Sequence, residues 1–243
     1  MIDLSHWVVW LLGVTLVPPM LICAFSLYPV RRHARRLGLV DQPGGHSTHV
    51  QVTPLGGGIG IWLGIVLTFA SGTVTVMLAR QSPQLQSWLP ESVVPLLDGV
   101  WLRVADLWWL MAAGTILFLL GLADDRRGVP VGIRLFVEFA VAVAVVYGLD
   151  VRLTAYIGVS WLTDLLSVVW IVAVINSFNM LDNMDGLSAG IAAIAAGLLA
   201  VVLLTTRVAH LEGPQLFVGG FLLVLVGGLL GFLWHNRPCL LYT

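Results

Sequence analysis

Seven long apolar stretches, separated by shorter polar connections, make up most of the chain. They lie near residues 7–29, 57–79, 105–123, 131–148, 165–181, 187–206 and 216–234. Each is close to the roughly 20 apolar residues that a helix needs to cross a bilayer. Because backbone groups in lipid must be satisfied within the segment, the pattern predicts an all-α, polytopic transmembrane helical bundle. No soluble domain is evident, so residues 1–243 are expected to form a single transmembrane domain.

The composition agrees with this prediction and narrows the function classes. Hydrophobic residues make up 58% of the chain and charged residues 10%, with a mean hydropathy of +0.96. The net charge of −1 gives no indication of a nucleic-acid partner. Cys23 and Cys239 form neither a disulfide framework nor a metal-ligand spacing.

The arginines predict how the chain is oriented in the membrane. All 12 cationic side chains are arginine, and two thirds of them fall on one side of the predicted spans. That side carries Arg31, Arg32, Arg35, Arg36, Arg126, Arg127, Arg134 and Arg237, against Arg80, Arg103, Arg152 and Arg207 on the other. Cytoplasmic connections carry an excess of basic residues, so the N-terminus is expected outside. The polar segments 31–56, 124–130, 176–186 and 235–243 then face the cytoplasm.

Two adjacent carboxylates, Asp124 and Asp125, stand at the end of the third apolar stretch. In the simplest interpretation they belong to a solvated turn. Adjacent carboxylates repel each other unless a cation is near, and such pairs commonly bind a divalent metal or accept a proton. Both interpretations stay open on the residues alone.

The segment "NSFNMLDNMDGLSAG", residues 176–190, concentrates oxygen donors between two apolar stretches. Asn176, Asn179, Asp182 and Asp185 recur every three residues, which on a helix places them on one slowly drifting stripe. Amide and carboxylate oxygens suit Mg²⁺. Gly186 is expected to break the helix before the next span. The alternative is that the amides hydrogen-bond neighbouring helices as packing groups.

A proline- and glycine-rich loop, "DQPGGHSTHVQVTPLGGGIG", runs into the second span. Backbone N–H groups at a helix N-terminus attract phosphate, and His46 and His49 add a switchable charge. Glycines spaced by four residues are typical of helices that pack closely in lipid. This spacing recurs at Gly56, Gly60, Gly64, Gly227 and Gly231.

Two ionisable residues, Arg134 and Glu138, lie four apart inside the fourth span. Ionisable groups at such depth usually face a bundle interior or a polar cleft. They either form a simple ion pair, or Arg134 grips an anionic substrate group near Asp125 while Glu138 holds the guanidinium. The residues alone favour neither.

Together these clusters resemble the polyprenyl-phosphate N-acetylhexosamine-1-phosphate transferases, glycosyltransferase family 4. "GLVDQPGGHSTHVQVTPLGGGI" is similar to the first cytoplasmic motif of that family, "GLADDRRG" to its Asp-Asp motif, and "NSFNMLDNMDGLSAG" to its Asn-x-x-Asn-x-x-Asp-x-x-Asp-Gly motif. The resemblance covers essentially the whole chain. The wording "NMLDNMDGL" is closer to the undecaprenyl-phosphate N-acetylglucosamine-1-phosphate transferase-like branch.

The resemblance implies transfer of a sugar 1-phosphate from a UDP-sugar to polyprenyl (undecaprenyl) phosphate, with release of UMP. The sugar expected is N-acetylglucosamine or a related hexose, in cell-envelope polysaccharide synthesis at the cytoplasmic face of the cell (inner) membrane. Mg²⁺, or Mn²⁺ in its place, is the implied cofactor. The sugar, the lipid length, the pathway and a homodimer are left open.

The resemblance also implies a role for individual residues. Asp124 and Asp125 would be the catalytic pair, although it does not say which of them acts as a base. The metal would bind Asn179, with Asp182 in support. Nucleotide contacts would come from Asp185 and Gly186, and phosphate contacts from Arg134 and His49.

The chain departs from the family pattern in two ways. It has no lysine, whereas the family usually places one near Ser47 and another where Arg134 stands. It also stops at "GFLWHNRPCLLYT", just before an expected Gly-Asp, whereas the family has about ten or eleven spans of roughly 20 residues each. We therefore expect a C-terminally truncated chain with little activity alone. The alternatives are a non-catalytic truncated paralogue or a multi-span transporter, whose binding groups usually lie near the bilayer midplane.

Overall fold

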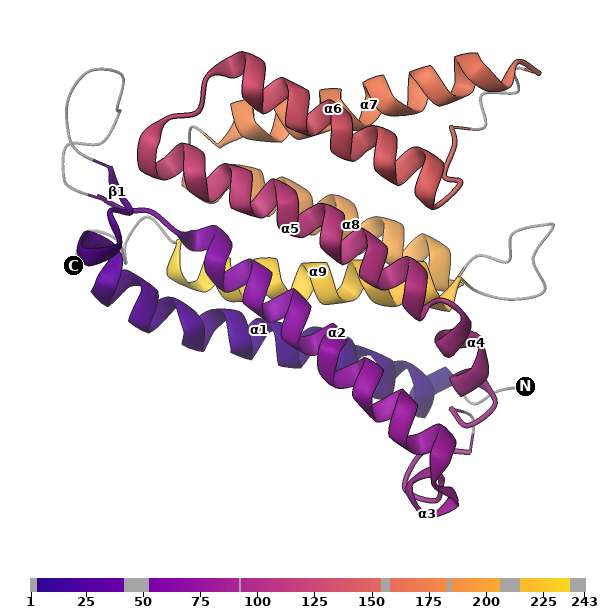
Figure 1. Cartoon of the computed structure of the whole chain (residues 1–243). Coiled ribbons are helices and arrows are strands. Elements are labelled where there is room, and N and C mark those ends of the chain that lie inside the picture. Colours follow the sequence, from indigo (N-terminus) through magenta and orange to yellow (C-terminus); the bar gives the residue numbers. More distant parts are fainter. Residues whose placement is uncertain are drawn as a thin grey trace. The chain divides into compact units, whose positions relative to one another are not determined.

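The computed structural model describes residues 4–41, 53–91, 93–153, 158–182, 185–205 and 215–236, with side chains from residue 10 onward except 41, 53 and 54. Nearly all of these residues are helical (Figure 1). The helices are α1 (Leu4–Leu37), α2 (Gly57–Gln81), α3 (Pro83–Gln86), α4 (Leu96–Leu102), α5 (Val104–Arg127), α6 (Val131–Gly148), α7 (Ser160–Leu181), α8 (Leu187–Thr205) and α9 (Leu216–His235). Two short strands, β1 (Val40–Asp41) and β2 (Thr53–Pro54), pair antiparallel.

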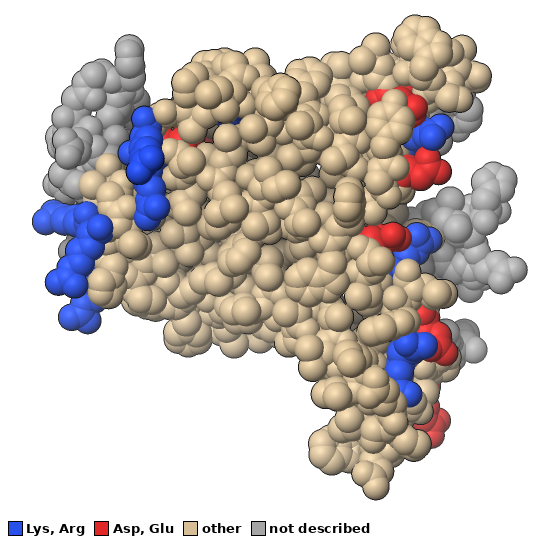
Figure 2. Space-filling view, in the orientation of Figure 1, with Lys and Arg blue, Asp and Glu red and all other residues tan. Residues whose placement is uncertain are grey.

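The predicted all-α architecture with seven spans is confirmed. In the described residues, seven helices are long and apolar enough to cross a membrane: α1, α2, α5, α6, α7, α8 and α9. Figure 2 shows that side chains without charge form most of the visible surface. Many large apolar side chains of these helices are exposed, as expected for a surface that lipid chains solvate. The protein is a multi-pass membrane protein.

The first helix is longer than the sequence predicts, since its arginine-rich end was expected to be a connection. "RRHARR" lies on the last turns of α1, which ends only at Leu37. Arginine is a good helix former, so the helix continues until Gly38 adopts a φ of +68°. The N–H of Leu39 bonds to the carbonyl of Ala34 at 2.9 Å, a Schellman termination. The fifth span likewise starts earlier than expected, at Ser160.

The helices form two compact units, which are described separately. The first comprises Met1–His33, Gly57–Val104 and Ala189–Thr243, and the second Ala34–Gly56 and Ala105–Ser188. The single domain expected from the sequence stays a prediction.

Close approach of helix backbones characterises the first unit, where α2 packs on α9. A Cβ added at Gly64 would lie 2.7 Å from the carbonyl oxygen of Pro19 on α1. At Gly227 and Gly231 a Cβ would again meet a carbonyl oxygen of α1, and at Gly60 it would meet the side chain of Leu27. The prediction that these four glycines serve close packing is therefore confirmed.

Gly56 was grouped with these packing glycines, and its packing role stays a prediction. The residue precedes α2 and has a φ of +103°. A left-handed φ is a turn conformation that glycine adopts without steric cost, so Gly56 serves the turn into α2.

The second unit is built around a helical hairpin of α6 and α7, which lie side by side (Figure 1). Its core is an apolar cluster of Ala142 and Val146 from α6 with Val168 and Val172 from α7. Helix α5 is tied to α6 by Trp109, whose Nε1–H donates to the carbonyl of Ala144 at 3.2 Å. The unit thus brings the end of α5, the start of α6 and the end of α7 into one folded body.

An ion pair closes the connected ends of this hairpin. The Arg152 Nε lies 3.1 Å from the Asp164 Oδ1, and the Arg152 Nη2 lies 2.9 Å from the Asp150 Oδ1. Asp164 is buried at the start of α7, whereas Asp150 is exposed. The backbone N–H of Leu153 donates to the Ser167 Oγ at 2.8 Å, which holds the connection on α7.

Candidate active site

The two adjacent carboxylates lie on the last turn of α5, and they differ in what surrounds them. The Asp124 Oδ1 accepts a hydrogen bond from the backbone N–H of Val129 at 2.6 Å, and the Asp124 carbonyl accepts one from Gly128 at 2.8 Å. Gly128 has a φ of +65°, which ends α5 and turns the chain towards Pro130 and α6. Asp124 is therefore part of the turn, while its neighbour Asp125 is exposed.

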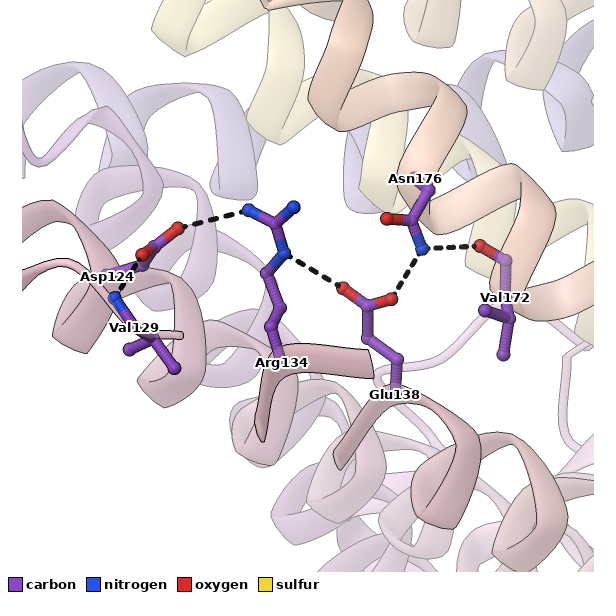
Figure 3. A network of polar contacts seen from close by, with 6 residues as sticks. All are labelled: Asp124, Val129, Arg134, Glu138, Val172 and Asn176. Atoms are coloured by element: carbon purple, nitrogen blue, oxygen red, sulfur yellow. Dashed lines mark hydrogen bonds and ion pairs between the residues drawn. The ribbon is translucent and has the colours of Figure 1, made fainter. Parts of the chain in front are cut away.

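Arg134, on the first turn of α6, joins Asp124 to a second acid. The Arg134 Nη1 lies 3.4 Å from the Asp124 Oδ2, and the Arg134 Nε lies 3.9 Å from the Glu138 Oε1 (Figure 3). The Glu138 side chain is 3% exposed, against 25% for that of Arg134. The ion pair of the first interpretation is present, and the guanidinium also reaches Asp124. A grip of Arg134 on a substrate group stays a prediction.

The network continues from Glu138 to the end of α7. The Asn176 Nδ2 donates to the Glu138 Oε2 and to the carbonyl of Val172, the latter at 3.0 Å. Three helices are therefore linked by side chains: α5 through Asp124, α6 through Arg134 and Glu138, and α7 through Asn176 (Figure 3).

The predicted stripe of four oxygen donors on one helix is wrong in its second half. Helix α7 ends at Leu181, so Asn176 and Asn179 are helical while Asp182 occupies the cap position and Asp185 the turn beyond it. Short carboxylate and amide side chains compete with the backbone for hydrogen bonds, which disfavours continuing a helix through a segment rich in them. Gly186, with a φ of +72°, precedes α8 and breaks the helix as expected.

The acids at the ends of α5 and α7 influence one another. The negative charges of Asp124 and Asp182 both repel the negative charge of the Asp125 carboxylate. Partial burial raises the pKa of Asp182, and the negative charge of Asp185 raises the pKa further. Neighbouring acids of this kind are stabilised by a nearby cation.

The donor chemistry fits a hard divalent cation such as Mg²⁺, because every candidate group is a carboxylate or amide oxygen. Among the described residues, no three His, Cys, Asp or Glu side chains form a group that could hold a metal ion. Mg²⁺ commonly keeps several waters or substrate phosphate oxygens and takes only one or two protein carboxylates. Asn179 is exposed and stands three residues after Asn176 on α7 and three residues before Asp182.

The structure thus brings most of the predicted site residues together in one unit. Asp124 meets Arg134 directly. The negative charge of Asp182 acts on Asp125, and that of Asp185 acts on Asp182. Gly186 lies directly after Asp185, whereas His49, like His46 and Ser47, lies outside the described residues.

The alternative that the amides of this segment hydrogen-bond a neighbouring helix is confirmed for Asn176, which donates to Glu138 of α6. Sequence reasoning did not identify Glu138 as the partner. It also missed that Asp124 caps the turn after α5. Asn176 and Glu138 are polar residues that each stand in an apolar run, and this position in the sequence is the signal that they could meet.

Comparison with known proteins agrees with this geometry. A family model described as "Glycosyl transferase family 4" matches residues 107–240, which include both the α5 acids and the segment after α7. The match gives no support to the transporter alternative.

Three curated relatives span both halves of the site. A "probable undecaprenyl-phosphate N-acetylglucosaminyl 1-phosphate transferase" of Bacillus subtilis (strain 168) is 28% identical over 217 residues, which is 85% of this chain and 50% of the relative. A "decaprenyl-phosphate N-acetylglucosaminephosphotransferase" of Mycobacterium tuberculosis (strain ATCC 25618 / H37Rv) is 30% identical over 89% of this chain and 51% of the relative. An "undecaprenyl-phosphate alpha-N-acetylglucosaminyl 1-phosphate transferase" of Escherichia coli (strain K12) is 30% identical over 77% and 46%. The chain spans about half the length of the curated relatives it matches.

Proposed function

This chain belongs to glycosyl transferase family 4, and on that premise we propose that the protein transfers a sugar 1-phosphate from a UDP-sugar to polyprenyl phosphate, releasing UMP. The names of the relatives favour N-acetylglucosamine 1-phosphate as the transferred group. The observation that carries the proposal is the side-chain linkage of three helices: α5 through Asp124, α6 through Arg134 and Glu138, and α7 through Asn176.

The two aspartates of α5 have different tasks in this proposal. Both carboxylate oxygens of Asp124 are engaged, one by the N–H of Val129 and the other by Arg134. Asp124 therefore fixes the turn and the guanidinium. Asp125 is exposed and is the carboxylate that meets the acceptor phosphate, where it takes up a proton if the acceptor arrives protonated.

Asn179 and Asp182 would hold Mg²⁺, or Mn²⁺ in its place. When bound, the metal would neutralise the charge of the diphosphate and of the departing UMP. Asp185 and Gly186 follow in the turn before α8 and would contact the nucleotide. Arg134 supplies a planar, permanently charged guanidinium to an anionic phosphate oxygen, in place of the lysine that the family resemblance leads one to expect.

The site would face the cytoplasm of the cell (inner) membrane, because the connections carrying most arginines lie on its side of the spans. A water-soluble UDP-sugar and a lipid-embedded acceptor can meet only at such a boundary. A homodimer stays a prediction of the family resemblance.

The experiment that tests this function is exchange of labelled UMP into UDP-N-acetylglucosamine by membranes carrying the full-length protein. Asp125→Asn and Asn179→Ala are each expected to lower exchange by about 100-fold or more, since they remove a reacting carboxylate and a metal ligand. Asp98→Asn, in the exposed connection between α2 and α5, is the control and should leave exchange unchanged. Full-length wild-type protein that catalyses no exchange with Mg²⁺ or Mn²⁺ would refute the proposal.

A further inference from the structure

Glu138 is a buried acid that no step of the proposed reaction uses. It lies inside α6 with 3% of its side chain exposed. An ionised carboxylate at that depth is costly unless its charge and its lone pairs are matched. Here each oxygen has its own partner, because Arg134 lies against Oε1 and Asn176 donates to Oε2.

These contacts determine which way the Asn176 amide faces. The Glu138 carboxylate and the Val172 carbonyl can only accept hydrogen bonds, so both must face the NH₂ end of the amide. The amide oxygen is thereby turned away from both acceptors. Figure 3 shows it pointing towards the side on which Arg134 lies.

The same carboxylate also orients the guanidinium. Arg134 Nε is buried and has no hydrogen-bond partner in the described residues, so Glu138 holds it by charge at 3.9 Å. Its Nη1 is directed to Asp124, and Figure 3 shows the remaining nitrogen pointing away from Asp124. One buried acid therefore orients a cationic donor on α6 and a neutral acceptor on α7.

We propose that Glu138 is a positioning residue of the transferase site, which sets the register of α6 against α7 and aligns Arg134 and the Asn176 amide for the substrate. The proposal rests on the proposed function. Asn179 lies three residues beyond Asn176 on the same helix, so fixing Asn176 also fixes where Asn179 stands relative to Asp124.

The chain supplies a matched control at the other end of the same hairpin. Asp164 is also a buried acid paired with an arginine, Arg152, and within the described part of the chain no hydrogen bond or ion pair joins it to a site residue. A merely structural role for Glu138 predicts that Glu138→Gln and Asp164→Asn behave alike. A positioning role predicts that only Glu138→Gln changes turnover.

The experiment measures kcat and KM of UMP release from UDP-N-acetylglucosamine, with thermal unfolding of each purified variant. Glu138→Gln should lower kcat roughly 10- to 100-fold, the range observed when groups supporting an active-site residue are removed. Asp164→Asn should leave kcat per folded molecule unchanged. Equal kcat values for the two variants would overturn the proposal.

A second test exchanges the carboxylate and the amide between positions 138 and 176. Asn176→Asp alone sets two carboxylates against each other and should lower kcat as much as Glu138→Gln. The double variant Glu138→Gln with Asn176→Asp restores one carboxylate and one amide, and should recover kcat at least about tenfold over the weaker single variant. A double variant no better than either single one would overturn the proposal.

Further outcomes distinguish a variant that fails to fold from a failure of the proposed function. If Glu138→Gln does not fold, Asn176→Ala decides: a fall in kcat of about tenfold or more supports the proposal, and an unchanged kcat overturns it. If the full-length wild type releases no UMP, the proposed function and this inference fail together. If the wild type is active and the variants match the control, the inference alone fails.

Discussion

The α6–α7 hairpin carries a buried acid and an arginine at each end, and the two pairs differ in what else they touch. At the connected end, Arg152 lies 3.1 Å from Asp164 and its only other ion-pair partner in the described residues is the exposed Asp150. At the open end, Arg134 lies 3.9 Å from Glu138 and reaches Asp124 on α5. Similar pairs thus close a loop in one case and join three helices in the other.

The comparison shows that a buried ion pair is not by itself evidence of function. A salt bridge taken out of water contributes little net stability, because desolvation offsets the attraction between the charges. The difference lies in the second oxygen of the acid. In Glu138 it orients the side chain of Asn176, which belongs to the segment of oxygen donors.

The largest effect is expected from removing either arginine. Arg134→Ala and Arg152→Ala each leave a buried carboxylate without its cation, which typically costs about 3–5 kcal/mol. Arg134→Ala should also abolish UMP exchange, whereas Arg152→Ala should leave exchange per folded molecule unchanged. Thermal unfolding and labelled-UMP exchange on the same samples check this. Equal loss of exchange in both variants would remove the distinction between the two ends.

A smaller loss of stability is expected in the first unit, which contains neither of the two arginine–acid pairs. Gly231→Ala places a Cβ against the carbonyl oxygen of Met20, and overpacking of this kind costs about 1–3 kcal/mol. Gly220→Ala on the same helix meets nothing within 4 Å and should be neutral or stabilising. The measurement is the midpoint of thermal unfolding in detergent. Equal midpoints would show that the α1–α9 approach is looser than described.

The smallest effect is expected from changing the more exposed acid that each arginine also contacts, which is Asp124 for Arg134 and Asp150 for Arg152. Asp124→Asn keeps an oxygen for the N–H of Val129 but loses the charge facing Arg134, and should cost about 0.5–1 kcal/mol. Its UMP exchange should fall several-fold while remaining above that of Asp125→Asn. Asp150→Asn should change stability by less than about 0.5 kcal/mol, since the pair is exposed and Asn tolerates the φ of +51° there. Exchange lost more completely in Asp124→Asn than in Asp125→Asn would reverse the proposed roles of the two aspartates.

Local pattern was sufficient for the helices and for several of their ends. The seven spans follow from runs of apolar residues, and the break at Gly186 follows from a glycine at the end of a polar segment. Prediction failed where two local preferences compete. The arginines of "RRHARR" favour both a connection and a helix, and the helix prevails up to Gly38. The donors after Asn179 have helical spacing but side chains that favour turns, and the turn prevails at Asp182.

By itself, the sequence determined that the chain is a multi-pass helical membrane protein and that its oxygen donors gather at the ends of particular spans, because hydropathy and residue type act over neighbouring positions. Only the tertiary structure decided that Asp124 is engaged by Val129 and Arg134 while Asp125 stays exposed. It also decided that Glu138 meets Asn176, 38 positions away. Such contacts depend on how α6 is rotated and shifted against α7, and that register is set by side-chain packing across the hairpin rather than by spacing along the chain.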